Sequence, residues 1–170
     1  MIKSSTNKQR QVYNMGYAFY YNTPIGQIII GEKDNRITHL LFKENPLPSG
    51  YVIKETSILA EANRQLQDYF KGQRKEFNLD LNPSGTEFMK KVWNSLRKIP
   101  YGETRSYKDI AISIGHDKAY RAVGLANNRN PIAIIIPCHR VIGANGNLVG
   151  YGGGLDIKTF LLELERSNTV

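Results

Sequence analysis

The chain has 170 residues, 41% hydrophobic and 22% charged, proportions that are ordinary for a globular protein and exclude a largely disordered one. Its one cysteine, Cys138, excludes an internal disulfide and a zinc site built from several cysteines. Of the net charge of +8, residues 83–140 carry +6, with ten Lys and Arg against four Asp and Glu, as is typical of a protein that binds nucleic acid phosphates.

The first ten residues, MIKSSTNKQR, lack the apolar centre of a signal peptide. No apolar run in the sequence approaches the roughly 18 residues that a membrane span needs. A lone cysteine also agrees with a reducing compartment. We therefore expect a cytoplasmic protein without a membrane partner.

The first half of the sequence predicts a small sheet covered by one helix. Residues 17–42 alternate aromatic or β-branched runs with turn signals, which predicts a three-stranded antiparallel meander. Residues 57–72 carry apolar side chains at helical spacing and end at Gly72, a typical helix terminator. This helix is expected to turn inward Ile58, Leu59, Ala62, Leu66, Tyr69 and Phe70.

The segment EFNLDLN, residues 76–82, is a candidate for one more strand. Composition and charge change directly after it. We therefore predict a domain boundary near residues 82–85, with an N-terminal domain over 1–82 and a C-terminal domain over 83–170.

The second half of the sequence is dominated by helical patterns. Residues 86–99 form one amphipathic pattern with Thr86 as the expected N-cap. Residues 106–115 and 118–128 form two short patterns separated by a turn, which is helix-turn-helix spacing, with an ordinary α-hairpin as the alternative. A last helix over 155–165 is expected to turn inward Leu155, Phe160, Leu161 and Leu164.

Cys138 follows an apolar run and stands between Pro137 and His139. Free cysteines are often small buried hydrophobes, which is the structural alternative for this one. Pro137 removes a backbone donor and would end a strand, placing Cys138 at the strand terminus, where side chains often face a cleft. A thiol with a pKa of about 8.5 is only a few per cent thiolate at pH 7, and a neighbouring His or positive charge raises that fraction. The pattern therefore favours a nucleophilic cysteine.

Four motifs resemble those of the O6-alkylguanine-DNA alkyltransferases, single-turnover DNA repair proteins. They are YGETRSY (101–107), RAVGLANNRNP (121–131), PCHRVIG (137–143) and GYGGGLDIKTFLLELE (150–165). The resemblance implies an α+β fold. A small ribonuclease-H-like antiparallel sheet with a helix would be followed by a mainly helical DNA-binding and active-site domain with a helix-turn-helix.

The resemblance also implies the chemistry. Cys138 would take the alkyl group from guanine O6 in duplex DNA, irreversibly and once per chain. His139 would deprotonate the thiol through a water, and Glu165 would orient that imidazole. Asn130 would be the hinge between the recognition helix and the active-site strand. O4-alkylthymine stays open as a second substrate.

For DNA and base recognition, the resemblance assigns Tyr107 to the target phosphate and the extruded base, and Arg121 to the gap that the base leaves. A flipped base is needed because a thiol cannot reach the target oxygen inside the duplex. The remaining binding positions are Val141 and Gly152, whose main-chain groups would read guanine, together with Tyr151, Ala122 and Gly124. No cofactor or metal is implied, because the Cys and His residues that bind zinc in some relatives are absent.

The expected partner is double-stranded DNA containing O6-alkylguanine, bound by a monomer. Three positions depart from common family choices, namely Gly152, Tyr120 and Ala133. Two alternatives stay open at this point. One is a cysteine hydrolase, since a Cys-His-acid set also serves acyl transfer. The other is a non-enzymatic DNA lesion-binding or helix-turn-helix regulatory protein, although relatives of the lesion-binding kind lack the cysteine.

Overall fold

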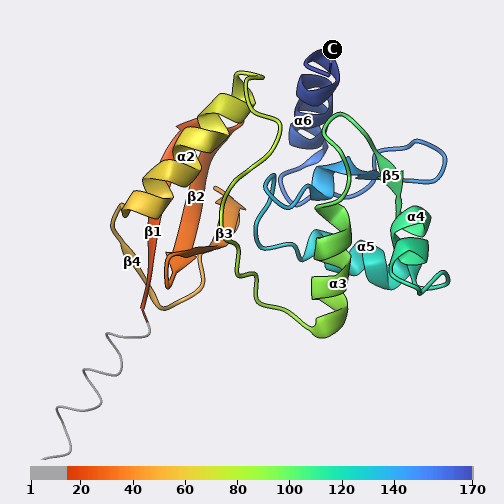
Figure 1. The fold of residues 1–170 in the computed structure, drawn as a ribbon, viewed down its shortest axis with the longest axis horizontal. Helices are drawn as coiled ribbons and strands as arrows, with labels where there is room; N and C mark the ends of the chain where they lie inside the picture. Colours follow the sequence, from red (N-terminus) through yellow and green to blue (C-terminus); the bar gives the residue numbers. More distant parts are fainter. Residues whose placement is uncertain (1–14, 170) are drawn as a thin grey trace, which may run out of the picture.

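In the computed structural model, which describes residues 15–169, a sheet with one helix lies beside a mainly helical half (Figure 1). The strands β1 (Gly16–Thr23), β2 (Gly26–Lys33) and β3 (Arg36–Phe42) are antiparallel neighbours, so the predicted meander is confirmed. The sequence analysis missed β4 (Tyr51–Ile53), which pairs parallel to β1 and completes the order β3-β2-β1-β4.

The turn between β2 and β3 follows directly from its sequence. Asp34 and Asn35 have φ angles of 53° and 58°. Tight two-residue hairpin turns require positive φ at both central positions, and Asp and Asn tolerate that conformation better than other residues with a side chain. This turn and a register shift between Gly31 and Glu32 together set the pairing of β3, whose Leu40 forms a bridge to Ile132 of the C-terminal half.

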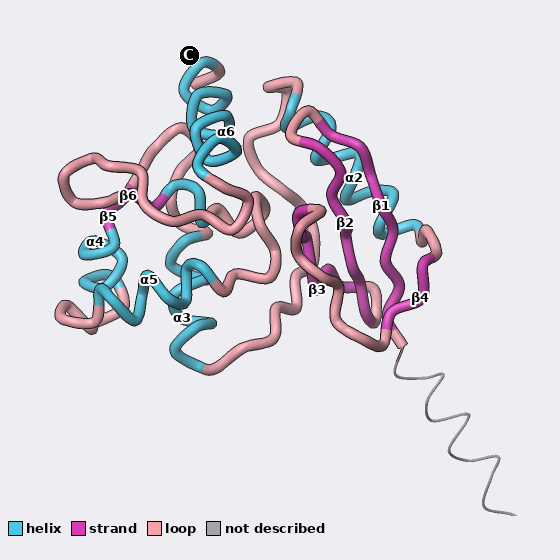
Figure 2. Tube along the Cα trace, turned by 180° about the vertical axis from the view of Figure 1, so that it is seen from behind, coloured by secondary structure: helices cyan, strands magenta, loops and turns pink. Residues whose placement is uncertain are grey.

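The helix α2 (Ser57–Phe70) runs across the strands of this sheet (Figures 1 and 2). Its inner face holds most of the predicted apolar side chains, while Ile58 is only half-buried. Gly72 follows the helix with a φ of 73°, as expected for a glycine that ends a helix.

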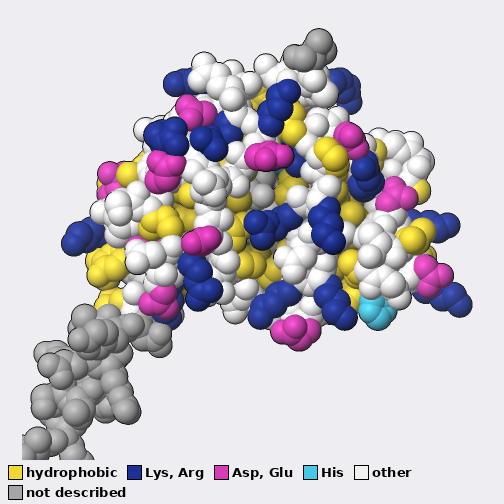
Figure 3. Space-filling model, in the orientation of Figure 1, with side chains coloured by type: hydrophobic (Ala, Val, Ile, Leu, Met, Phe, Trp, Pro, Cys, Tyr) yellow, Lys and Arg dark blue, Asp and Glu magenta, His cyan; other side chains and the backbone are white. Residues whose placement is uncertain are grey.

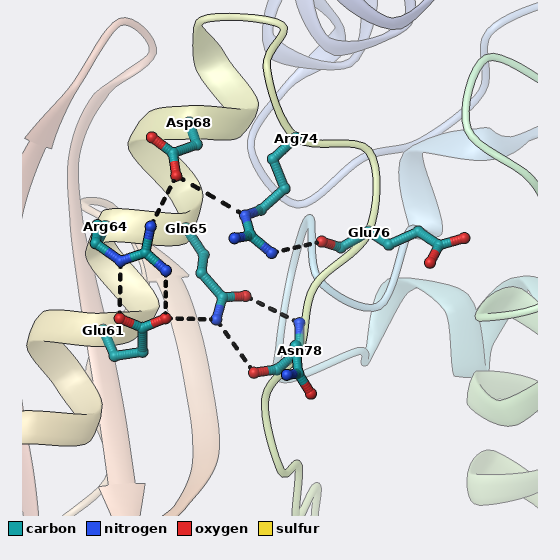
Figure 4. A network of polar contacts seen from close by, with 7 residues as sticks. All are labelled: Glu61, Arg64, Gln65, Asp68, Arg74, Glu76 and Asn78. Atoms are coloured by element: carbon teal, nitrogen blue, oxygen red, sulfur yellow. Dashed lines mark hydrogen bonds and ion pairs between the residues drawn. The ribbon is translucent and has the colours of Figure 1, made fainter.

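The strand proposed over residues 76–82 is wrong. Only Leu81 forms a bridge, an isolated one to Ile37. The segment is instead held by a side chain: Gln65 of α2 donates to the Asn78 carbonyl at 3.1 Å and accepts from the Asn78 amide at 2.9 Å (Figure 4). A buried glutamine therefore satisfies backbone groups that a neighbouring strand would otherwise pair.

The C-terminal half contains α3 (Glu87–Leu96), α4 (Tyr107–Ser113), α5 (Tyr120–Asn128) and α6 (Leu155–Ser167). Thr86 accepts a hydrogen bond from the Met89 amide at 3.2 Å, which confirms it as the N-cap of α3. Helices α4 and α5 pack on each other across the predicted turn. Two short parallel strands, β5 (Arg105–Ser106) and β6 (Val141–Ile142), connect the start of α4 to the segment after Cys138.

The expected active-site strand before Cys138 is also wrong, because residues 132–136 form a tight buried turn. The Ile135 amide donates to the Ala133 carbonyl at 2.8 Å, and the Ile136 amide donates to Ile132 at 3.0 Å. Ile134 has a φ of 72°, which β-branched residues rarely adopt. A short apolar run does not by itself distinguish a strand from another buried segment.

The inward face of α6 differs from the expected one. Leu161 is buried and Leu164 half-buried, but Leu155 and Phe160 are 48% and 37% exposed. Lys158 and Glu165 are instead fully buried. Lys158, Leu161 and Glu165 are spaced by three and four residues and therefore share one helix face. The expected inward face was wrong because it was chosen from the apolar residues alone. The charged side chains of Lys158 and Glu165 are buried as well, each with hydrogen-bond partners.

On the face shown in Figure 3, Lys and Arg side chains lie on both halves of the molecule, with Asp and Glu between them. Positive charge on this face is therefore not confined to one half of the molecule. Among residues 15–169, no helix combines the length and apolar character that crossing a bilayer requires.

We predict that Leu66→Ala lowers the free energy of unfolding by about 2–5 kcal/mol, because it empties a fully buried position under α2. Arg64→Ala on the same helix is the control. Arg64 is exposed, and its ion pairs with Glu61 and Asp68 (Figure 4) should contribute little. Urea denaturation followed by circular dichroism measures both variants. Equal losses would contradict the assignment of Leu66 to the core.

Candidate active site

Cys138 begins a single 3-10 turn, η1 (Cys138–Arg140), and is 5% exposed. Burial raises the pKa of its thiol, and the side chain of Asn130 and the charge of Lys158 only partly offset that effect. The structure thus differs from the expectation that its neighbours would increase the thiolate fraction. At neutral pH the resting thiol is protonated, so a nucleophilic role requires a group that removes its proton.

His139 and Glu165 are both fully buried and in direct contact, with Nε2 of His139 2.7 Å from Oε1 of Glu165. Burial opposes ionisation of Glu165, yet hydrogen bonds and charges from His139 and Arg140 hold the pKa of this carboxyl far below its usual range. Because an ionised carboxylate only accepts hydrogen bonds, Nε2 of His139 must carry the hydrogen.

The other imidazole nitrogen is therefore the basic one. Burial lowers the pKa of His139 in spite of the neighbouring Glu165, so the ring is neutral near pH 7. In a neutral imidazole with a hydrogen on Nε2, Nδ1 keeps its lone pair. Nδ1 is buried and makes no hydrogen bond with any residue of the described range 15–169. The site thus holds a base with an unused acceptor.

Glu165 receives hydrogen bonds from four residues in three separate parts of the chain. Besides His139, Arg140 donates to both carboxylate oxygens at 2.9 Å. Tyr69 of α2 donates to Oε1 at 2.7 Å, and the Gly102 amide donates to Oε2 at 3.1 Å. Neither Tyr69 nor Arg140 was assigned to the site from the sequence. Arg140 could have been suspected, since it follows His139 directly.

Asn130 closes the turn that precedes Cys138. Its Nδ2 donates to the Ile136 carbonyl at 2.8 Å, and its Oδ1 accepts from the Ile132 amide at 3.0 Å. The same side chain lowers the pKa of the Cys138 thiol. Asn127 at the end of α5 donates to the Cys138 carbonyl at 3.4 Å. The end of α5 is therefore linked to the thiol through side-chain amides, and not through a strand.

Tyr107 and Lys158 meet at one carbonyl, that of Val149. The Tyr107 hydroxyl donates to it at 3.1 Å, and Lys158 Nζ donates to it at 3.2 Å and to the Val141 carbonyl at 2.6 Å. Burial lowers the pKa of Lys158, while Cys138 raises it. Lys158 thus brings a buried cationic group to the site. The sequence analysis missed Lys158, although it lies two helical turns before Glu165 on the same face of α6.

A cavity of about 340 Å³ opens beside Cys138, and both halves of the chain line it. Tyr151 and Gly152 form part of it from the C-terminal half, and Phe42 comes from the end of β3. The rings of Phe42 and Tyr151 have centroids 5.8 Å apart. A Cβ at Gly152 would meet no atom within 4 Å. The glycine at this position, which departs from a common family choice, therefore leaves open space beside it.

The recognition-helix residues are placed apart from this cavity. Arg121 and Ala122 are exposed at the start of α5, and the Arg121 guanidinium lies 5.9 Å from the exposed Tyr120 ring. Gly124 faces the Tyr107 ring, which a Cβ there would approach to 3.7 Å. The structure therefore brings together Cys138 with the expected site residues His139, Glu165, Asn130, Tyr107, Val141, Tyr151 and Gly152, whereas Arg121 and Ala122 lie on the outer surface.

Known proteins match this chain along most of its length. The ribonuclease-like domain of 6-O-methylguanine DNA methyltransferase matches residues 16–83, and the DNA binding domain of that family matches residues 87–167. The crystal structure of Mycobacterium tuberculosis OGT in complex with DNA superposes with a TM-score of 0.86 at 46% identity, covering 89% of this chain and 94% of that one.

Two curated relatives carry the same name, methylated-DNA–protein-cysteine methyltransferase. The protein of Methanosarcina barkeri is 54% identical over 156 residues, which cover 88% of this chain and 98% of the relative. The constitutive protein of Bacillus subtilis is 50% identical over 161 residues, 89% of this chain and 96% of the relative. Because such identities extend over almost the whole of each relative, this chain belongs to the methylated-DNA–protein-cysteine methyltransferase family.

Proposed function

We propose that this protein repairs duplex DNA by transferring the alkyl group from O6 of guanine to Sγ of its own Cys138. The observation that carries the site assignment is a buried thiol at a cavity, next in the chain to a neutral imidazole whose Nδ1 makes no hydrogen bond within residues 15–169. Family membership supports the reaction class, since the relatives are named for a cysteine acceptor and methylated DNA. A cysteine hydrolase does not fit that membership.

In the proposed step, Sγ attacks the alkyl carbon, an S–C bond forms, and the C–O6 bond breaks with its electron pair going to the guanine. The thiol proton moves to Nδ1 of His139, directly or through a water, and Glu165 stabilises the imidazolium that forms. The departing guanine anion takes up one proton from solvent while the imidazolium of His139 releases one, so the guanine leaves as the normal base and His139 becomes neutral again. A thioether has no easy route to hydrolysis, so each chain reacts once.

The developing thiolate needs stabilisation, because burial raises the pKa of Cys138. Asn130, Lys158 and Tyr151 each act in the opposite direction on that pKa. Burial, together with Cys138, raises the pKa of Tyr107, so its hydroxyl stays protonated. Its one hydrogen, which the Val149 carbonyl accepts in this structure, would turn to the extruded base when that base enters the cavity. We assign Val141, Tyr151 and Gly152 to binding of that base.

On the DNA side, the proposal assigns to the duplex the exposed Arg121 and Ala122 at the start of α5, together with the half-buried Gly124 further along the helix. Small residues there permit close approach of the helix to a groove without base readout. The cytoplasmic location, the monomeric state and the division of the chain into domains 1–82 and 83–170 stay predictions.

We predict that Cys138→Ser abolishes alkyl transfer, since a serine hydroxyl barely ionises at neutral pH, while DNA binding stays near the wild-type value. Incubation with an oligonucleotide containing O6-methylguanine, followed by intact mass measurement, tests this. The wild-type chain should gain one methyl group, and a proteolytic map should place it on Cys138. A methyl gain in the serine variant would remove Cys138 from the mechanism.

Glu165→Gln should slow transfer and also destabilise the fold by about 3–5 kcal/mol at pH 7, because Arg140 would lose its buried anionic partner. Since the folded-state pKa of Glu165 lies below the usual 4.5, its contribution to stability is present above that pH and is lost as the pH falls further.

Glu165→Gln should therefore lose less stability than the wild type when the pH is lowered below 4.5. Urea denaturation at pH 7, 5 and 3 measures it, with Glu163→Gln, an exposed position on the same helix, as the matched control. Wild-type stability of Glu165→Gln at pH 7 would contradict the buried ion-pair assignment.

Arg121→Ala should react about tenfold or more slowly with O6-methylguanine in duplex DNA, but near normally with free O6-benzylguanine. The reason is that a guanidinium stabilises the gap left by a flipped base, and the free base leaves no gap. Single-turnover rates at saturating protein separate the two substrates. Lys118→Ala, next to α5, is the control for a general phosphate contact. Equal losses on both substrates would show that Arg121 supports the pocket or the fold.

A further inference from the structure

Tyr69 lies in the last turn of α2 and is fully buried. Its ring packs against Phe70, Phe77 and Tyr101, with centroids 5.6, 5.5 and 6.1 Å away. A phenylalanine would fill the same aromatic cluster without a polar atom. Within residues 15–169, the hydroxyl of Tyr69 has one partner, Oε1 of Glu165, which is 96 positions away along the chain and 2.7 Å away in space.

The oxygen that Tyr69 contacts is the one that holds the imidazole. Oε1 of Glu165 accepts hydrogen bonds from Tyr69, His139 and Arg140. Counting the two bonds to Oε2, five donors share the roughly four lone-pair positions of one carboxylate. Each added donor takes up negative charge that would otherwise stabilise a proton on His139.

We propose that Tyr69, from the N-terminal half, is a positioning residue that sets the basicity of His139 by sharing Oε1 of Glu165 with it. This rests on the proposed role of His139 as the base. The Tyr69 hydroxyl keeps His139 neutral at the pH at which it must accept the thiol proton. Tyr69, which does not line the cavity beside Cys138, thereby takes part in the reaction from behind the imidazole.

The Tyr69 hydroxyl itself does not titrate in the working range. Burial raises its pKa well above the ordinary value, and the charge of Glu165 raises it further. It is therefore a constant donor. The other titratable or charged groups around His139 and Glu165 are Arg140 and Cys138 of η1, Lys158 of α6, Tyr101 in the loop before β5, and Tyr151 in the loop before α6. Tyr69→Phe leaves all of these in place.

The expected effect has a definite sign. Without the Tyr69 hydroxyl, more of the charge on Oε1 is available to the bond with Nε2 of His139, so the pKa of His139 rises. The base works only in its neutral form, so the acid limb of the rate profile moves to higher pH, by about one pH unit for the loss of one charged hydrogen bond. At high pH, where His139 is neutral in both proteins, the rate should not fall.

The experiment compares the full-length wild type with Tyr69→Phe and Tyr101→Phe. Tyr101 is the matched control, because its ring lies in the same cluster but its hydroxyl makes no hydrogen bond within residues 15–169. Single-turnover methyl transfer from an O6-methylguanine oligonucleotide is measured at saturating protein from pH 5.5 to 9. Only the Tyr69→Phe profile should move, and the Tyr101→Phe profile should overlay the wild type.

A second readout is independent of activity. Imidazole nitrogen chemical shifts give the pKa of His139 directly, with His139→Ala used to identify its signal among the three histidines. A higher pKa in Tyr69→Phe supports the proposal. An unchanged or lower pKa, an equal rate loss at every pH, or the same shift in Tyr101→Phe would overturn it. If the wild type gained no methyl group, the proposed function would fail, while the titration would still decide the role of Tyr69.

Discussion

The burial of one carboxylate, that of Glu165, is the constraint on which the rest of the site depends. Removing a carboxylate from water costs several kcal/mol unless its oxygens are hydrogen-bonded and its charge is paired. Glu165 meets that condition with donors from α2, from the loop at Gly102 and from η1. The same contacts hold the two halves of the chain together at the point where the reactive residues meet. A buried pair of this kind is weak evidence for stability, but breaking it is costly, so it favours one arrangement over others.

The chemistry of the site follows from that constraint. An ionised Glu165 fixes the hydrogen of His139 on Nε2 and leaves Nδ1 as the acceptor. Arg140 neutralises much of the charge on Glu165, and burial lowers the pKa of His139, so the ring is a neutral base. Burial also keeps the Cys138 thiol protonated at rest, which protects it from reaction with adventitious electrophiles. Reactivity then depends on proton removal at the moment when a substrate occupies the cavity.

The spacing of apolar residues predicted the elements whose structure depends on local sequence. It did not predict the segments whose structure depends on tertiary contacts. The meander, α2 and the helix-turn-helix followed from apolar spacing, turn residues and the Thr86 cap. The inward face of α6 did not follow from these signals. Lys158 and Glu165 can be buried there because carbonyls and side chains remote in sequence form hydrogen bonds with them. The turn over residues 132–136 was missed because its backbone groups are satisfied by the Asn130 side chain, by bonds within the turn and by Leu40 of β3, none of which apolar spacing reveals. Motif resemblance located Cys138, His139 and Glu165, but it carried no information on Tyr69, which reads as an ordinary core residue of an amphipathic helix.

The N-terminal half therefore contributes more than a scaffold. Its strand β3 places Phe42 in the wall of the cavity beside Cys138, where that ring lies against Tyr151 and Gly153. Its helix α2 delivers a hydroxyl to the carboxylate behind His139. If the C-terminal half stood alone, one side of the cavity would open to water and one donor of Glu165 would be lost. Both changes act on the pKa values of buried groups, since water entering the cavity removes the desolvation that keeps Cys138 and His139 uncharged. Residues from both predicted domains thus determine the chemistry of the site.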